Sequence, residues 1–161
     1  MSIVSDTSPL NYLVLIDAVD LIPQLYLRLL IPPVVLEELM AEGSPPPVRR
    51  WASRLPPWIA VEAATRSIDH PRLHRGEAEA IALAEEVHAE LLLVDEKIGR
   101  EIARARGLDT LGVLGLLDVA ASRGMVRLPE FLDRLLQTNF RISRDLMAEV
   151  ILRESQRRQQ K

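Results

Sequence analysis

The sequence predicts an α/β fold with a mostly parallel central sheet. Short apolar strands alternate with longer helical segments along the 161 residues, as expected for parallel β-α units. The run from Leu91 to Val94 is wholly apolar and bounded by charge, which is typical of a central parallel strand. The core residues are mainly Leu, Ile, Val and Ala, with only two each of Phe, Tyr and Trp.

The elements follow from local patterns. We expect strands over residues 3–4, 29–31, 59–61 and 91–94. Ser8 is expected to cap a first helix that has Pro9 in its first turn. Further helices are expected over residues 34–42, 76–89, 96–106, 112–123, 130–138 and 144–156. The proline-rich stretch 44–57 predicts an irregular connection with at most one short helix.

Composition excludes several classes of protein. The 23 acidic and 20 basic residues give a net charge of −3, which argues against a polybasic nucleic-acid binder. The absence of cysteine excludes disulfides and thiol nucleophiles. The first basic residue is Arg28, and no charge-free apolar stretch is long enough to span a membrane. We therefore expect a cytoplasmic protein without a secretory signal or membrane segment.

Two acidic residues follow predicted strands. Asp6 comes after Ile3 and Val4, and Asp95 comes after Val94. Because active residues gather at the carboxyl ends of parallel strands, these carboxylates are expected to meet. A divalent cation such as Mg²⁺ would neutralise the pair through oxygen ligands. The alternatives are that Asp6 only caps a helix and that Lys97 pairs with Asp95.

Two predicted helices carry neighbouring glutamates. The helical wheel does not decide between Glu37 and Glu38, which both lie far from the apolar face. In the later helix, Glu77 lies near the edge of the buried face, whereas Glu79 lies further round toward solvent. Taken alone, each of these residues is most simply a solvated helix residue.

Together, these acids stand in segments that resemble the four acidic motifs of PIN-domain nucleases, including VapC-type toxin ribonucleases. The four segments are Ile3–Leu10, Ile31–Leu39, Gly76–Ala84 and Leu92–Glu96. In the resemblance the motif acids are Asp6, Glu38, Glu77 and Asp95. The stretch Thr110–Gly115 resembles a little-characterised prokaryotic branch of the family that has Glu at the third motif. The resemblance implies a PIN-like three-layer α/β/α sandwich with a mostly parallel central sheet. It places the catalytic domain over 1–125 and a C-terminal helical extension of that domain, with a polar tail, over 126–161.

The resemblance also implies a function. It indicates a metal-dependent endoribonuclease that hydrolyses RNA, the toxin of a type II toxin–antitoxin pair, with an antitoxin partner and a homodimeric state. Mg²⁺ or Mn²⁺ would be held by Asp6 and Asp95, with Glu38 and Glu77 acting through water or on the nucleophile. Thr7 or Ser8 would hydrogen-bond Asp6, or else cap the helix.

Substrate phosphate is expected to meet arginine at the rim of the acidic pocket. Arg75, Arg100 and Arg104 lie nearest to the motifs, and arginine binds phosphate in a bidentate manner. The alternative is that they pair with Glu96 and Glu101 on a helix surface. The histidines, including His74, show no metal-ligand spacing and are expected to be solvated.

A second hypothesis is a PIN-fold binding or regulatory module without catalysis. It is motivated by departures from the common toxin motif around Asp95, where Leu93 replaces Thr or Ser and Lys97-Ile98 replaces Asp-Phe. Metal binding separates the two hypotheses, because an inactive module has no need of the cation.

Overall fold

The computed structural model describes residues 2–160. Its sheet has five strands in the order β3-β2-β1-β4-β5, and every neighbouring pair is parallel. The strands are β1 (Ser2–Ser5), β2 (Arg28–Ile31), β3 (Ile59–Val61), β4 (Leu91–Leu93) and β5 (Thr110–Leu111). The α/β prediction is therefore confirmed, and the sheet is entirely parallel. The sequence did not predict β5, because two residues are too few to show a period.

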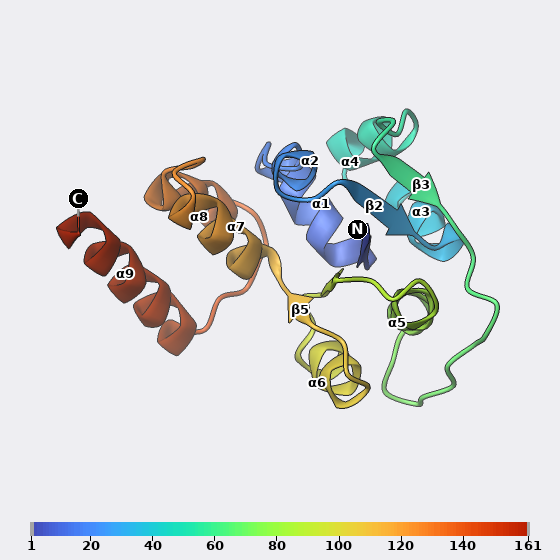
Figure 1. Cartoon of the computed structure of the whole chain (residues 1–161). Coiled ribbons are helices and arrows are strands. Elements are labelled where there is room, and N and C mark those ends of the chain that lie inside the picture. The colour runs from blue at the N-terminus through green and yellow to red at the C-terminus, as the bar shows by residue number, and fades with distance from the viewer. Residues whose placement is uncertain (1, 161) are drawn as a thin grey trace. The chain divides into compact units, whose positions relative to one another are not determined.

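The described residues also form helices, which Figure 1 draws as coiled ribbons. They are α1 (Thr7–Leu15), α2 (Leu21–Leu25), α3 (Pro33–Met40), α4 (Pro46–Ala52), α5 (Arg75–Glu86), α6 (Lys97–Ala105), α7 (Val113–Ser122), α8 (Leu128–Leu136) and α9 (Arg144–Gln159). The proline-rich stretch holds one short helix, α4, as predicted. The helix α2 was not predicted, because five residues around Pro23 carry no helical period.

The predicted cap of the first helix is wrong by two residues. The N-cap is Asp6, and Ser8 lies inside α1. The carboxylate of Asp6 makes no capping hydrogen bond. Asp6 therefore occupies the N-cap position without capping the helix through its side chain.

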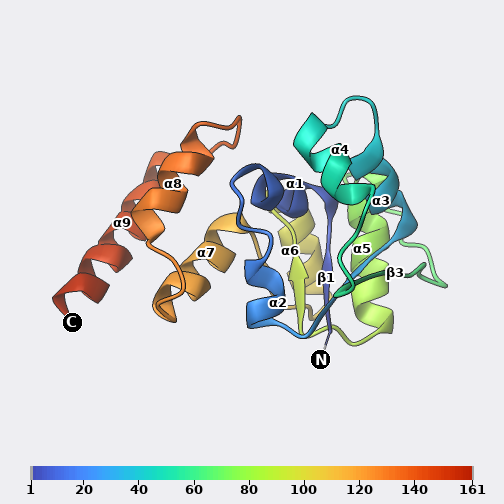
Figure 2. The same ribbon diagram turned by 90° about the horizontal axis from the view of Figure 1, so that it is seen from above.

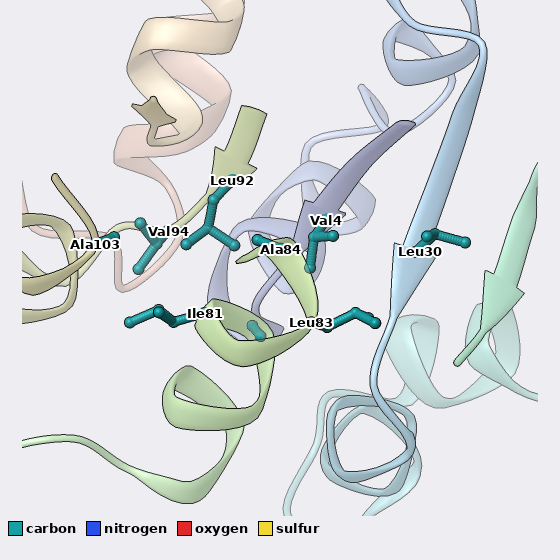
Figure 3. Packing of buried hydrophobic residues seen from close by; sticks show 9 residues of the cluster. Val4, Leu30, Ile81, Leu83, Ala84, Leu92, Val94 and Ala103 are labelled. Atoms are coloured by element: carbon teal, nitrogen blue, oxygen red, sulfur yellow. The ribbon is translucent and has the colours of Figure 1, made fainter. Parts of the chain in front are cut away.

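The core of the sheet is built on α5. Ala80, Ile81, Leu83 and Ala84 of this helix pack with strand residues such as Val4 and Leu92 in one buried cluster (Figure 3). Each of these side chains is at most 1% exposed. Figures 1 and 2 show α5 and α6 on one face of the sheet and α1 and α2 on the other. The packing fixes the rotation of α5 and hence the direction of its polar first turn.

The chain divides into two compact units, one up to Val113 and one from Leu114 onward. The first unit contains the sheet. The second unit is helical, and Asp118 ties α7 to α9 through ion pairs with Arg153 and Arg157 at 3.4 and 2.8 Å. Within residues 2–160, no helix has the length and apolar character needed to cross a membrane.

Candidate active site

Asp6 and Asp95 lie at the carboxyl ends of adjacent strands. β1 and β4 are paired in register, with Ser5 opposite Leu93, and the backbone N–H of Asp6 donates to the Leu93 carbonyl at 3.0 Å. Asp6 is only 5% exposed. Asp95 accepts a hydrogen bond from the Val113 N–H at 2.8 Å through Oδ1. Parallel pairing thus places both carboxylates at one edge of the sheet, as the sequence predicted.

The structure brings Glu38 and Glu77 to the same pocket. Glu77 is in the first turn of α5 and is 4% exposed, and its Oε1 accepts the His74 N–H at 3.1 Å. Its Oε2 is buried without a hydrogen-bond partner. By contrast, Glu79 lies outside the pocket lining and forms a salt bridge with Arg75 at 3.2 Å.

Three glycines lie against these carboxylates. A Cβ at Gly76 would lie 2.9 Å from Glu38 Oε1 and 3.2 Å from Asp6 Oδ1. A Cβ at Gly99 would lie 2.5 Å from Glu77 Oε2, and one at Gly112 would lie 2.6 Å from Asp95 Oδ1. Because real Cβ atoms do not approach so closely, a side chain at any of these positions would displace an acid.

Burial shifts three of the acids toward their protonated forms. Burial, together with the negative charges of Glu77, Glu38 and Asp95, raises the pKa of Asp6 to about 7, although a hydrogen bond from the Thr7 backbone N–H opposes the shift. Burial also raises the pKa of Asp95 to about 6, against hydrogen bonds from Val113 and Ser8 and the positive charge of Arg100. The pKa of Glu77 is likewise raised by burial. Among the described residues, none of these three acids forms a salt bridge.

The hydroxyls of Thr7 and Ser8 donate hydrogen bonds to acids other than Asp6. Thr7 donates to Glu38 Oε2, and Ser8 donates to Asp95 Oδ2 at 3.4 Å. Each hydroxyl has a single proton, so neither binds Asp6 as the sequence predicted. The Lys97 ammonium pairs with Glu101 Oε1 at 4.0 Å and not with Asp95, so the alternative that Lys97 pairs with Asp95 is wrong.

The pocket has a volume of about 470 Å³. Asp6, Glu38 and Glu77 line it, whereas Asp95 is not part of the lining but is hydrogen-bonded to the lining residue Ser8. Besides predicted residues, the pocket is lined by Asn11, Tyr12, His74 and Glu96. Sequence reasoning missed these four as site residues. Asn11 and Tyr12 follow Ser8 by three and four residues, so they share its helix face, a signal that was available. His74 is exposed, as expected, yet it lies at the pocket because it is the N-cap of α5.

The three predicted arginines are placed differently from one another. Arg75 is 72% exposed and precedes pocket-lining Gly76. Arg100 donates to the main-chain carbonyl of Asp95 at 2.6 Å, and Arg104 donates to the Thr110 hydroxyl at 2.9 Å. The alternative pairing of Arg100 and Arg104 with Glu96 and Glu101 is absent from the salt bridges of the described residues.

A hard divalent cation fits the chemistry of this donor set. The residues at the pocket offer carboxylate oxygens and no thiol, and Glu77 Oε2 has no other partner. No three acidic or histidine side chains among residues 2–160 form a ready-made metal cluster. Magnesium keeps several waters and is often bound by one or two carboxylates plus substrate phosphate, so such a cluster is not a requirement.

Comparison with known proteins identifies the class of protein that this fold and acidic edge define. The family described as PIN domain (DUF3368) matches residues 2–156, and the chain belongs to it. PIN domains are generally nucleases. Among solved structures, the chain is similar to "a PilT N-terminus domain protein SSO1118" from the hyperthermophilic archaeon Sulfolobus solfataricus P2. The identity is 17%, the TM-score is 0.50, and the match covers 89% of this chain and 100% of that one. No curated protein matches.

Proposed function

We propose that this chain is a metal-dependent endoribonuclease that acts at the pocket lined by Asp6, Glu38 and Glu77, together with the neighbouring Asp95. The observation that carries the proposal is the convergence of the buried Asp6 and Glu77 with the part-buried Asp95 and the exposed Glu38 at the carboxyl edge of a parallel sheet, without salt bridges among the described residues. Burying an unpaired acid is costly. A purely structural site would be better served by neutral or paired side chains, so the cost favours a bound cation.

Each acid has a distinct role in this proposal. Asp6 and Asp95, on adjacent strands, are the principal ligands of Mg²⁺ or Mn²⁺. Glu77 Oε2 and the Glu38 carboxylate hold water ligands or orient the attacking water. When bound, the ion would lower the pKa of a water and offset negative charge on the phosphate. Thr7 and Ser8 hold Glu38 and Asp95 in place through the hydrogen bonds described above.

The arginines divide between substrate and scaffold. Arg75 is proposed to contact substrate phosphate, because its exposed side chain precedes the pocket-lining Gly76 and its partner Glu79 is a surface residue. Arg100 holds the main chain of Asp95. For Arg104 to contact phosphate, as the sequence suggested, it would have to give up its hydrogen bond to the Thr110 hydroxyl.

The test is cleavage of a fluorogenic single-stranded RNA with Mg²⁺ or Mn²⁺. Asp6→Asn and Asp95→Asn are expected to lower the rate by about 10³-fold, a loss typical of removing a key electrostatic group. The chain supplies matched controls. Glu77→Gln should impair cleavage strongly while Glu79→Gln should change it little, and Glu38→Gln should exceed Glu37→Gln.

Two outcomes would overturn the proposal. One is full activity in both aspartate variants. The other is the absence of cleavage of any RNA together with the absence of Mn²⁺ binding, which would support a PIN-fold module without catalysis.

We extend the proposal to a biological setting. The resemblance of the four motifs to VapC-type toxins supports a toxin that acts as a homodimer and is blocked by an antitoxin protein. A small reading frame beside the gene, whose product restores growth when co-expressed, is the expected finding.

A further inference from the structure

The two compact units carry opposite excess charge. From Leu114 onward the sequence has nine basic and six acidic residues, whereas residues 1–113 have eleven basic and seventeen acidic ones. A unit with an acidic pocket repels the polyanion that it is proposed to cut. The excess of arginine in the helical unit is therefore a feature that the pocket chemistry does not explain.

The helical unit contains a cleft of about 650 Å³. It is lined by the end of α7, the first turns of α8 and the last turns of α9. The side chains that matter are Arg127, Arg157, Arg158, Glu130, Glu154 and Phe131. Arginines thus enter the cleft from two different helix ends.

The acids of this cleft already have basic partners. Glu130 accepts from Arg134 at 2.9 Å. Glu154 is paired with Arg157 at 2.9 Å and more loosely with Arg158 at 3.6 Å. Arg157 is in addition bound to Asp118. The acids are therefore largely neutralised within the unit.

Two arginines of the cleft, Arg127 and Arg158, are available to bind a ligand. Arg127 is exposed and forms no ion pair with any residue that the structure describes. Arg158 is 62% exposed, and its partner Glu154 stays paired through Arg157 if Arg158 turns away. Both side chains can take a phosphate without leaving a carboxylate unpaired.

We infer that this cleft is a binding site for the phosphate backbone of single-stranded RNA, with Arg127 and Arg158 as phosphate contacts. The inference rests on the proposed function, because it supplies the affinity that an acidic pocket lacks. The guanidinium fork matches phosphate in a bidentate manner. A groove of this kind binds without reading sequence, since phosphate contacts carry no base information.

Fluorescence anisotropy with a labelled twelve-nucleotide RNA tests the inference. The full chain is titrated in EDTA at several salt concentrations. Arg127→Gln combined with Arg158→Gln is expected to weaken binding at least tenfold. It should also lower the slope of log affinity against log salt by about 0.7 for each lost phosphate contact.

Arg141→Gln combined with Arg144→Gln is the matched control. These two arginines are exposed, belong to the same unit and lie outside the cleft lining. The control should change the affinity by less than threefold. The inference would be overturned if the two double variants lowered the affinity equally, or if the Arg127→Gln, Arg158→Gln variant bound RNA as tightly as the unsubstituted chain. Displacement of the RNA by polyglutamate at equal charge, which would indicate an acidic protein as the ligand, would also overturn it.

Cleavage of a trinucleotide with Mn²⁺ keeps this test separate from the proposed function. So short a substrate reports on the acidic pocket, and both double variants should cleave it at the rate of the unsubstituted chain. If the unsubstituted chain binds the longer RNA but cleaves no RNA, only the proposed nuclease activity is contradicted. If the Arg127→Gln, Arg158→Gln variant cleaves the trinucleotide normally and binds the longer RNA without loss of affinity, only the proposed binding cleft is contradicted.

Discussion

Each of the two units contains an aspartate that is largely shielded from solvent, but the two aspartates have opposite surroundings. In the sheet unit, Asp6 is 5% exposed, forms no salt bridge with a described residue and has a pKa raised to about 7. In the helical unit, the side chain of Asp118 is 19% exposed and lies between Arg153 and Arg157. The second arrangement is how a protein stabilises an acid for its own fold. The first leaves the acid in need of a partner from outside the chain.

The same substitution should therefore have opposite effects in the two units, and this is the largest difference we expect. Asp118→Asn leaves Arg153 and Arg157 without their shared carboxylate and should lower the unfolding free energy by about 2 kcal/mol. Asp6→Asn removes an unpaired buried charge and should raise stability by about 1–2 kcal/mol at pH 8 in EDTA. Thermal melts compare the two variants. A loss of stability in both variants would contradict the difference we infer between the paired Asp118 and the unpaired Asp6.

The dependence of stability on pH is a second effect, of similar size. The folded pKa values of about 7 for Asp6 and about 6 for Asp95 exceed the ordinary aspartate value of 3.8. The folded chain thus binds more protons between these values, so this contribution is fully present at low pH and is lost as pH rises through 6 and 7. From pH 5 to pH 8 in EDTA, Asp6 contributes over about two pH units and Asp95 over about one, so the loss should be roughly 4 kcal/mol.

Denaturant titrations of the unsubstituted chain and of the Asp6→Asn, Asp95→Asn double variant measure this contribution by difference. Saturating Mg²⁺ should reduce the loss in the unsubstituted chain, because the ion binds the ionised acids. An identical pH profile in both proteins would contradict the burial argument.

The smallest effect concerns the glycines. Gly99→Ala forces Glu77 Oε2 away from a position 2.5 Å from the new Cβ. The affinity for Mn²⁺ should fall by about tenfold, as for loss of an orienting neighbour. Gly43→Ala is the control, since nothing lies within 4 Å of a Cβ at that position. Calorimetric titration should show unchanged Mn²⁺ binding for the control, and a similar fall in both variants would count against the role of Gly99.

The fold and the strand-end acids were predictable from local patterns. Asp6 and Asp95 follow apolar runs, and parallel pairing then brings them together. The position of Glu77 at the edge of an amphipathic face also signalled its burial, because packing of α5 fixes its rotation.

Other features depend on contacts that no local pattern encodes. Whether Thr7 donates to Asp6 or to Glu38 is decided by α3, which is distant in sequence. The placement of His74 depends on where the long segment after β3 rejoins the sheet unit. The pairing of Asp118 with Arg153 and Arg157 links residues more than thirty positions apart, and the chain offers many other acids to those arginines.

Calorimetric titration of Mn²⁺ into the chain at pH 7.5 tests the central claim most directly, namely that the acids of the sheet unit are left unpaired in order to bind a cation. We expect saturable binding that Asp6→Asn abolishes and Asp118→Asn leaves unchanged. Absence of binding at millimolar Mn²⁺, or equal binding by the Asp6→Asn variant, would contradict the claim.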